Sequence, residues 1–260
     1  MDREIARGGA ARVFRATDAA GNVVALKVLH PQLAVTVSAD RFLREIKYLS
    51  RIDHPRITRL LDSGESDFLI FYVMTFVEGL TLREHLQKAR HLSVNDTLII
   101  ANDLLDALGH AHGLEIVHRD VKPENIVVSP DGPVLVDFGI ARAAAEAGTD
   151  RLTKSGFAVG SSRYMSPEQI QGADDIDVRT DLYSLGCVLF ECLTGRTPFA
   201  APREEQVMRM HLESTAPDVR TVRDSVPQAL AETIAKSLAN RREDRWSSAR
   251  EMQLALGNSS

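Results

Sequence analysis

Cysteine is scarce in this sequence, and an excess of basic residues is lacking. The 260 residues include only Cys187 and Cys192, five positions apart in one apolar segment. Two cysteines so placed exclude a disulfide framework and a cysteine zinc site, and we expect buried reduced thiols. Lys and Arg number 31 against 36 Asp and Glu, a formal charge of −5. That balance disfavours binding to nucleic acid or to an anionic membrane.

Long hydrophobic runs are also missing. The longest, residues 68–77, has ten residues and includes Thr75, which is about half of what a membrane-spanning helix needs. The first letters, MDREIARGG, lack the apolar core of a signal peptide. With 44% hydrophobic and 26% charged residues, the composition is that of a globular protein. These absences predict a soluble protein without a membrane span, located in the cytoplasm.

The hydrophobic pattern changes from strand-like to helical along the chain, without internal repeats. Residues 12–18 and 22–29 are short β-branched runs separated by Ala-Ala-Gly, which predicts a hairpin. Residues 92–113 show helical periodicity, with Gly113 at the end and Gly109 inside at a cost of about 1 kcal/mol. Residues 181–195 are apolar on all sides, which predicts a buried helix, and residues 226–257 predict further helices.

This pattern predicts one α+β domain over residues 1–260, built from two lobes. A small β-rich lobe with one main helix is expected over 1–76, and a larger, mostly helical lobe over 80–258. A hinge near residues 75–79 would join them. Clefts between such lobes are common ligand sites.

The string HRDVKPEN, residues 118–125, is the strongest candidate for chemistry. It places Asp120 and Asn125 five positions apart, and a hairpin-like pair follows and ends at Asp137. Two carboxylates and an amide brought together in this way can hold a hard cation, which prefers oxygen ligands. Lys122 adds a positive charge beside Asp120. Such a cluster suits phosphoryl transfer, which depends on positioning and on neutralisation of developing charge.

The sequence resembles the eukaryotic-like Ser/Thr protein kinases, in particular the bacterial branch, over essentially its whole length. The motifs of that family occur in order. They are Val24-Ala25-Leu26-Lys27, Glu45 on the following helix, HRDVKPEN, Asp137-Phe138-Gly139, Ser166-Pro167-Glu168 in place of Ala-Pro-Glu, Asp181 with Gly186, and Arg245 as the partner of Glu168. The resemblance implies the bilobal protein kinase fold.

The resemblance also implies roles for individual residues. Lys27, positioned by Glu45, would hold the α- and β-phosphates of ATP, Asp120 would accept or orient the substrate hydroxyl, and Lys122 would steady the γ-phosphate. Asn125 and Asp137 would bind Mg²⁺, or Mn²⁺ in its place. The residues implied to contact ATP are Ala6, Arg7, Gly8, Gly9, Val13, Ala25, Lys27, Met74, Thr75, Phe76, Val77, Asn125, Val127 and Asp137, with Met74 behind the adenine and 75–77 as the hinge.

The phosphate loop departs from the family pattern of three glycines. Gly8 is kept and Gly9 is an additional glycine, whereas Ala6 and Ala11 replace the first and third. Glycine serves there because backbone approaches phosphate closely and can need a positive φ. The two alanines therefore predict a stiffer loop and weaker ATP binding.

Residues 140–167 correspond to the activation segment of the family. Thr153 and Ser155 stand where bacterial relatives carry phosphorylated threonines. Autophosphorylation is expected at Thr153, with Ser155 or Thr149 next, and is expected to activate the enzyme. Arg119 and Arg142 are candidates to meet such a phosphate. The alternative is that these are merely polar loop residues. Ser161 matches a family position that contacts Asp120 and Lys122.

Three other functions compete with a Ser/Thr protein kinase acting on protein hydroxyls. A pseudokinase scaffold is favoured only by the altered glycine loop. Small-molecule kinases of the aminoglycoside or choline type lack the Ser166-Pro167-Glu168 element and the helix with Asp181 and Gly186. A metal-dependent hydrolase is disfavoured because no His, Cys and carboxylate cluster has zinc spacing. Protein substrates with Ser or Thr acceptors are the expected partners, nucleic acid is not, and a homodimer is compatible with the resemblance.

Overall fold

The computed structural model describes residues 2–8, 11–30, 43, 46–66, 69–138 and 161–257. They form two compact units. Residues 2–78 together with 137–138 make up the first, here called the β-rich unit. Residues 79–136 together with 161–257 make up the second, the helical unit. The predicted α+β class, with a five-stranded sheet in the smaller part and helices in the larger, is confirmed.

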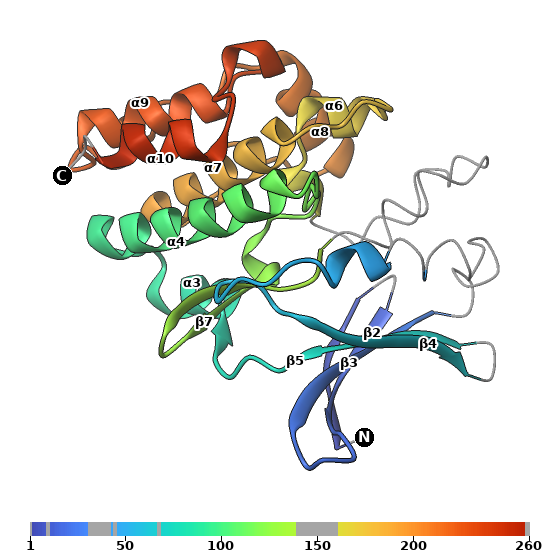
Figure 1. Cartoon of the computed structure of the whole chain (residues 1–260). Coiled ribbons are helices and arrows are strands. Elements are labelled where there is room, and N and C mark those ends of the chain that lie inside the picture. The colour runs from blue at the N-terminus through green and yellow to red at the C-terminus, as the bar shows by residue number, and fades with distance from the viewer. Residues whose placement is uncertain are drawn as a thin grey trace. The chain divides into compact units, whose positions relative to one another are not determined.

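The β-rich unit is built on one antiparallel sheet with the strand order β1-β2-β3-β5-β4 (Figure 1). Its strands are β1 Arg3–Arg7, β2 Ala11–Thr17, β3 Val23–Leu29, β4 Leu60–Ser66 and β5 Leu69–Thr75. The predicted hairpin joins β2 to β3. Its turn is closed by the Asp18 carboxylate, which accepts from the backbone N–H groups of Ala20 (2.9 Å) and Asn22 (2.8 Å), and Gly21 takes the positive φ of 88°.

One main helix is expected in the β-rich lobe, and its described part lies between β3 and β4. Residues 46–49 are helical, and Ile46 is fully buried whereas Leu49 is half-buried. The described part of this helix therefore turns Ile46 toward the core.

The helical unit combines a small sheet with a set of packed helices. The sheet has the order β6-β7-β8. The strands of this unit are β6 Leu80–Thr81, β7 Ile126–Ser129 and β8 Gly132–Leu135. Its α-helices are α3 Leu82–Ala89, α4 Val94–Gly113, α6 Pro167–Gln171, α7 Arg179–Thr194, α8 Glu204–Glu213, α9 Gln228–Ser237 and α10 Ala249–Gly257. Its short 3-10 helices are η1 Pro123–Asn125, η2 Ser161–Tyr164, η3 Val219–Thr221 and η4 Arg242–Asp244.

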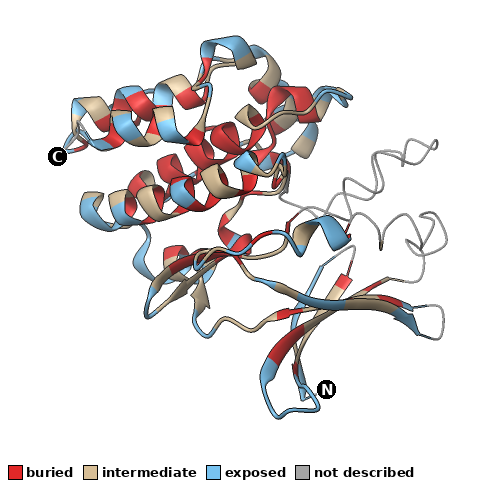
Figure 2. Cartoon of the chain, viewed as in Figure 1, coloured by how far each residue is buried: buried red, intermediate tan, exposed pale blue. Residues whose placement is uncertain are grey.

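Helix α7 forms the centre of the helical unit, packed against α4 and α9 (Figure 1). It is buried along almost its whole length, as its apolar sequence predicted (Figure 2). The thiols of Cys187 and Cys192 are free and buried, and burial raises the pKa of both, so they are inert. Gly195 ends the helix with a left-handed φ of 75°.

Helix α4 begins after Ser93, whose side chain accepts from the backbone N–H of Asp96. It ends at Gly113, as predicted, although the capping residue is Leu114. No helix within the described residues is both long and apolar enough to cross a membrane.

Candidate active site

One face of the five-stranded sheet carries four of the predicted nucleotide residues. In the strand register, Val13 lies opposite Lys27, and Ala25 lies opposite Met74. Direct partners in an antiparallel pair share a face, and residues two apart along a strand share it as well. The four side chains therefore project from the same face, and Ala25 and Met74 are buried.

Lys27 forms an ion pair with Asp137, with Nζ 2.8 Å from Oδ1. Burial alone would lower the pKa of Lys27, but the negative charge of Asp137 outweighs it and the pKa is raised. The lysine is therefore a fixed positive charge at neutral pH. Asp137 holds an unusual backbone φ of 61°, and such conformations occur most often at functional sites.

The turn between β1 and β2 is the predicted phosphate loop. The backbone N–H of Gly8 donates to the carbonyl of Ala11 at 2.9 Å, and Ala6 pairs with Val13 in the β1–β2 ladder. Neither alanine has a positive φ, so neither strains the backbone. The Arg7 side chain is exposed and bound to Glu4 at 2.8 Å. Gly9 and Ala10 lie outside the described residues.

The predicted hinge follows directly from β5. The backbone N–H of Thr75 donates to the carbonyl of Arg59 at 3.0 Å, and the Thr75 hydroxyl accepts from the Arg59 N–H at 3.0 Å. Because the Thr75 N–H is already used, backbone N–H donors for a ligand would come from the half-buried Phe76 and Val77.

The helical unit holds a second cluster in the loop before β7. The Lys122 ammonium lies 2.7 Å from Oδ2 of Asp120. The Asn125 amide donates to the same oxygen and to the Asp120 carbonyl, both at 2.8 Å. Pro123 opens the short helix η1, which folds Asn125 back onto Asp120. Val127 lies on β7, opposite Thr81 and Val134.

Asp181, on α7, fixes the backbone of this loop through hydrogen bonds. Its fully buried carboxylate accepts from the backbone N–H groups of His118 and Arg119 and from Nε2 of His112, each at 2.8 Å. Burial would raise the pKa of Asp181, but the hydrogen bond from His112 and the other contacts of the carboxylate outweigh burial, and the pKa is lowered. The network holds Arg119 at a φ of 65° and orients Asp120, the next residue.

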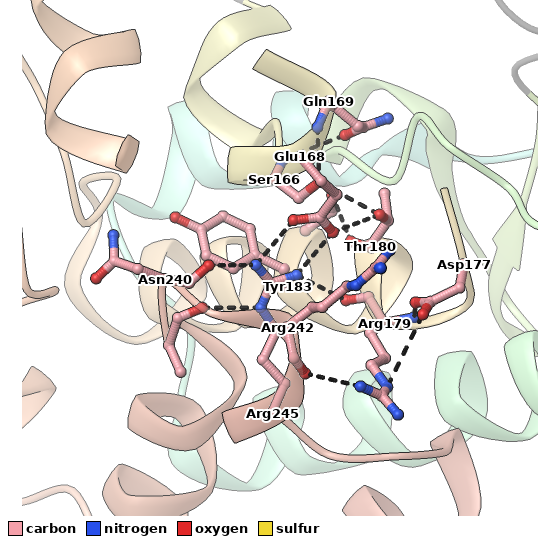
Figure 3. Close-up of polar contacts among 12 residues, drawn as sticks. Ser166, Glu168, Gln169, Asp177, Arg179, Thr180, Tyr183, Asn240, Arg242 and Arg245 are labelled. Atoms are coloured by element: carbon pink, nitrogen blue, oxygen red, sulfur yellow. Dashed lines mark hydrogen bonds and ion pairs between the residues drawn. The ribbon is translucent and has the colours of Figure 1, made fainter. Parts of the chain in front are cut away.

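Helix α6 and Arg245 form a further buried network in the helical unit (Figure 3). The Arg245 guanidinium binds both oxygens of Glu168, at 2.8 and 2.9 Å, which confirms the pairing predicted from the sequence. Ser166 caps α6 by accepting from the backbone N–H of Gln169. Gln169 in turn donates to the Arg119 carbonyl at 2.9 Å. The serine of Ser166-Pro167-Glu168 is thus a helix cap, and Gln169 connects α6 to the Asp120 loop.

Sequence reasoning missed a second polar network, around Arg83. Its guanidinium binds Glu124 and Glu191 at 2.7 Å each, and the Tyr164 hydroxyl donates to Glu191 at 2.5 Å. The partners lie 41 and 108 positions from Arg83. No local spacing signals such a contact. Tyr72, which lies opposite Lys27, was missed because it stands inside an apolar run.

Several predicted residues lie outside the described part of the chain. They are Gly9, Glu45, Gly139, Arg142, Thr149, Thr153 and Ser155, and the Ser161 side chain is not described either. The predicted Lys27–Glu45 pair and the phosphorylation sites therefore stay predictions.

The donor atoms of Asp137 and Asn125 suit Mg²⁺. Asp137 offers a carboxylate whose side chain is 21% exposed, and Asn125 uses its amide nitrogen toward Asp120, which leaves its oxygen as the donor. Among the described residues, no group of three or more His, Cys, Asp or Glu is placed to hold a metal alone. Mg²⁺ typically binds through one or two carboxylates together with substrate phosphates, and the donor chemistry of each of these two residues, taken by itself, fits that mode.

Comparison with known proteins agrees with this geometry. The family model for the protein kinase domain matches residues 1–255. The serine/threonine-protein kinase PknD of Mycobacterium tuberculosis is 40% identical over 97% of the chain and 38% of its own length. PrkC of Bacillus subtilis is 37% identical over 96% of the chain and 39% of its own length. The chain thus spans about two-fifths of the length of these relatives.

A solved structure shares the fold. The crystal structure of Rad53 1–466 in complex with AMP-PNP has a TM-score of 0.80 and 24% identity, covering 97% of this chain and 63% of that one. The ordered motifs, the two polar clusters and the match over residues 1–255 agree. The chain therefore belongs to the protein kinase domain family.

Proposed function

We propose that the chain transfers the γ-phosphoryl group of ATP to Ser or Thr hydroxyls of proteins. The Asp120–Lys122–Asn125 cluster carries this proposal, because a carboxylate, an ammonium and an amide meet within 2.8 Å on a loop fixed by a buried carboxylate. The Lys27–Asp137 pair supports it with a second, fixed set of charges. The family resemblance assigns both sets to one reaction.

In the proposed reaction, Asp120 orients the acceptor hydroxyl and takes its proton. A bond forms between the hydroxyl oxygen and the γ-phosphorus while the bond from that phosphorus to ADP breaks. Lys27 holds the α- and β-phosphates, and Lys122 offsets negative charge on the transferred group. Asn125 and Asp137 would hold Mg²⁺, or Mn²⁺, which neutralises phosphate charge when bound.

Proteins rather than small molecules are the proposed acceptors. The support is the buried α6–Arg245 network, which anchors the Ser166-Pro167-Glu168 element absent from small-molecule kinases. The printed names of the relatives, serine/threonine-protein kinases, point the same way. The AMP-PNP in the Rad53 structure supports an ATP-type nucleotide. Activation by autophosphorylation and a homodimer are further expectations from the resemblance, and a cytoplasmic setting is an expectation from the sequence composition.

No observation favours the pseudokinase alternative. Its only support was the altered glycine loop, and Ala6 and Ala11 sit in strands without positive φ. The proposal is therefore an active enzyme.

The acceptor class can be tested by offering alternatives side by side. The purified chain with Mg-ATP would receive a Ser/Thr-rich protein, a Tyr-only copolymer, choline and an aminoglycoside. We expect phosphate only on the Ser/Thr-rich protein, located by mass spectrometry. Phosphate on a small molecule, or on tyrosine alone, would contradict the proposal.

A further inference from the structure

Tyr72 is a buried tyrosine beside the proposed catalytic lysine. It lies on β5 in direct register with Lys27 on β3. Only 3% of its surface is exposed. Its neighbours along the run 68–77 are almost all apolar, and an isoleucine or phenylalanine would fill such a core position without placing a hydroxyl there.

The phenol of Tyr72 contacts the lysine rather than only filling space. The Lys27 ammonium lies 5.6 Å from the centroid of the Tyr72 ring, and the two side chains interact through their polar groups. Burial raises the pKa of Tyr72 to about 12, although the positive charge of Lys27 opposes the shift. The hydroxyl is therefore neutral at physiological pH, and its oxygen can accept from the ammonium.

Among the residues that the structure describes, Lys27 has two polar neighbours of different character. Asp137 is a charged partner at 2.8 Å, but its carboxylate is also the proposed cation ligand. When the Asp137 carboxylate binds a cation, less of its negative charge is available to the Lys27 ammonium. A neutral acceptor on the neighbouring strand does not compete for the cation.

We propose that Tyr72 is a positioning residue for Lys27, whose hydroxyl holds the ammonium toward the nucleotide phosphates. This inference rests on the proposed function, because it assigns Lys27 to the phosphates of ATP. Tyr72 acts through Lys27 and does not itself contact the reacting atoms. The position therefore tunes phosphate affinity rather than adenine affinity.

Tyr72→Phe tests the inference because it keeps the ring and removes only the hydroxyl. Binding of Mg-ATP and of adenosine would be measured by calorimetry. We expect the Kd for ATP to rise about tenfold, as for loss of a hydrogen bond to a charged group, with the Kd for adenosine unchanged. Tyr48→Phe is the matched control, since that tyrosine is 61% exposed, and it should change neither value.

A double-mutant cycle with Lys27→Met separates positioning from packing. If Tyr72 acts through Lys27, Tyr72→Phe should have no further effect on ATP binding in the Lys27→Met background. An equal loss in both backgrounds, or an equal loss for ATP and adenosine, would overturn the inference. If Tyr72→Phe left ATP binding unchanged while Lys27→Met still weakened it, the inference about Tyr72 would be overturned and the proposed role of Lys27 would stand. Equal ATP affinity of the parent and Lys27→Met would overturn the proposed role of Lys27 and the inference together.

Discussion

Arg245 and Glu168 form a bidentate ion pair across 77 positions of sequence, and both side chains are buried. The guanidinium also donates to the carbonyls of Ala239 and Asn240, at 2.8 and 2.9 Å. The carboxylate accepts from the Thr180 hydroxyl at 2.6 Å. Burial would raise the pKa of Glu168, but the hydrogen bond and charge of Arg245 lower it. The pair fixes α6, which in turn holds the Asp120 loop through Gln169.

Removing the arginine of this pair should be costly. Arg245→Met leaves the Glu168 carboxylate buried without its counter-charge, and such losses reduce the free energy of unfolding by about 3–5 kcal/mol. Arg209→Met is the matched control, because it breaks an exposed pair with Glu213, and such pairs contribute little to stability. Urea unfolding measures both. Similar losses in the two variants would contradict the structural role given to the buried pair.

Two glycines on helices should respond in opposite directions to the same substitution. A Cβ at Gly186 on α7 would lie 2.8 Å from Cβ of Ser237 on α9, so Gly186→Ala should destabilise by about 1–3 kcal/mol through overpacking. At Gly109 on α4 the nearest contact would be an ordinary 3.6 Å, to Ala249. Gly109→Ala should stabilise by about 0.5–1 kcal/mol, since it removes a flexible residue from a helix.

Thermal unfolding of both glycine variants checks the prediction. The midpoint should fall for Gly186→Ala and rise for Gly109→Ala. A rise for Gly186→Ala would mean that α7 and α9 do not pack as closely as described.

Stability should fall below neutral pH because of His211. This histidine on α8 is fully buried, with Nδ1 2.7 Å from the Tyr183 hydroxyl, and burial lowers its pKa from 6.5 to about 4. A depressed pKa means that the unfolded chain takes up the proton first. The contribution of neutral His211 to the free energy of unfolding is complete above pH 6.5. It is lost as the pH falls toward 4, and the total loss is up to about 3 kcal/mol.

The measurement is the free energy of unfolding at pH 7 and pH 5 for the parent and His211→Gln. Between these values the parent should lose about 2 kcal/mol more than the variant. The same pH dependence in both proteins would show that His211 is not held neutral in the fold.

The alanines of the phosphate loop should weaken ATP binding through their methyl groups. Since Ala6 and Ala11 have no positive φ, the effect comes from space and stiffness near the phosphates rather than from backbone strain. Ala6→Gly and Ala11→Gly should therefore lower the KM for ATP in steady-state assays. Unchanged KM and kcat in both variants would reject this explanation of the departure from the family pattern.

Much of the fold and part of the site were predictable from local pattern. β-branched runs located β2 and β3, helical periodicity located α4, and a segment apolar on all sides located α7, each to within about two residues. The string HRDVKPEN predicted the cluster of Asp120, Lys122 and Asn125. Long-range polar contacts were not predictable without the family: Arg83 meets Glu191 only because helices 108 positions apart pack together. The role of Tyr72 was not predictable because its neighbours in the sequence are apolar and its contact with Lys27 depends on the register of β3 and β5.

Autophosphorylation is the most direct test of the proposed chemistry. The parent protein, Asp120→Asn and Lys27→Met would be incubated with Mg-ATP and the phosphates located by mass spectrometry, with Asp224→Asn, an exposed acid, as control. We predict phosphate on Thr153, Ser155 or Thr149 in the parent and the control, and a loss of at least about 100-fold in rate for the two site variants. Phosphate at equal levels in Asp120→Asn, or none on the chain or on a Ser/Thr-rich protein while ATP binds, would contradict the proposed function.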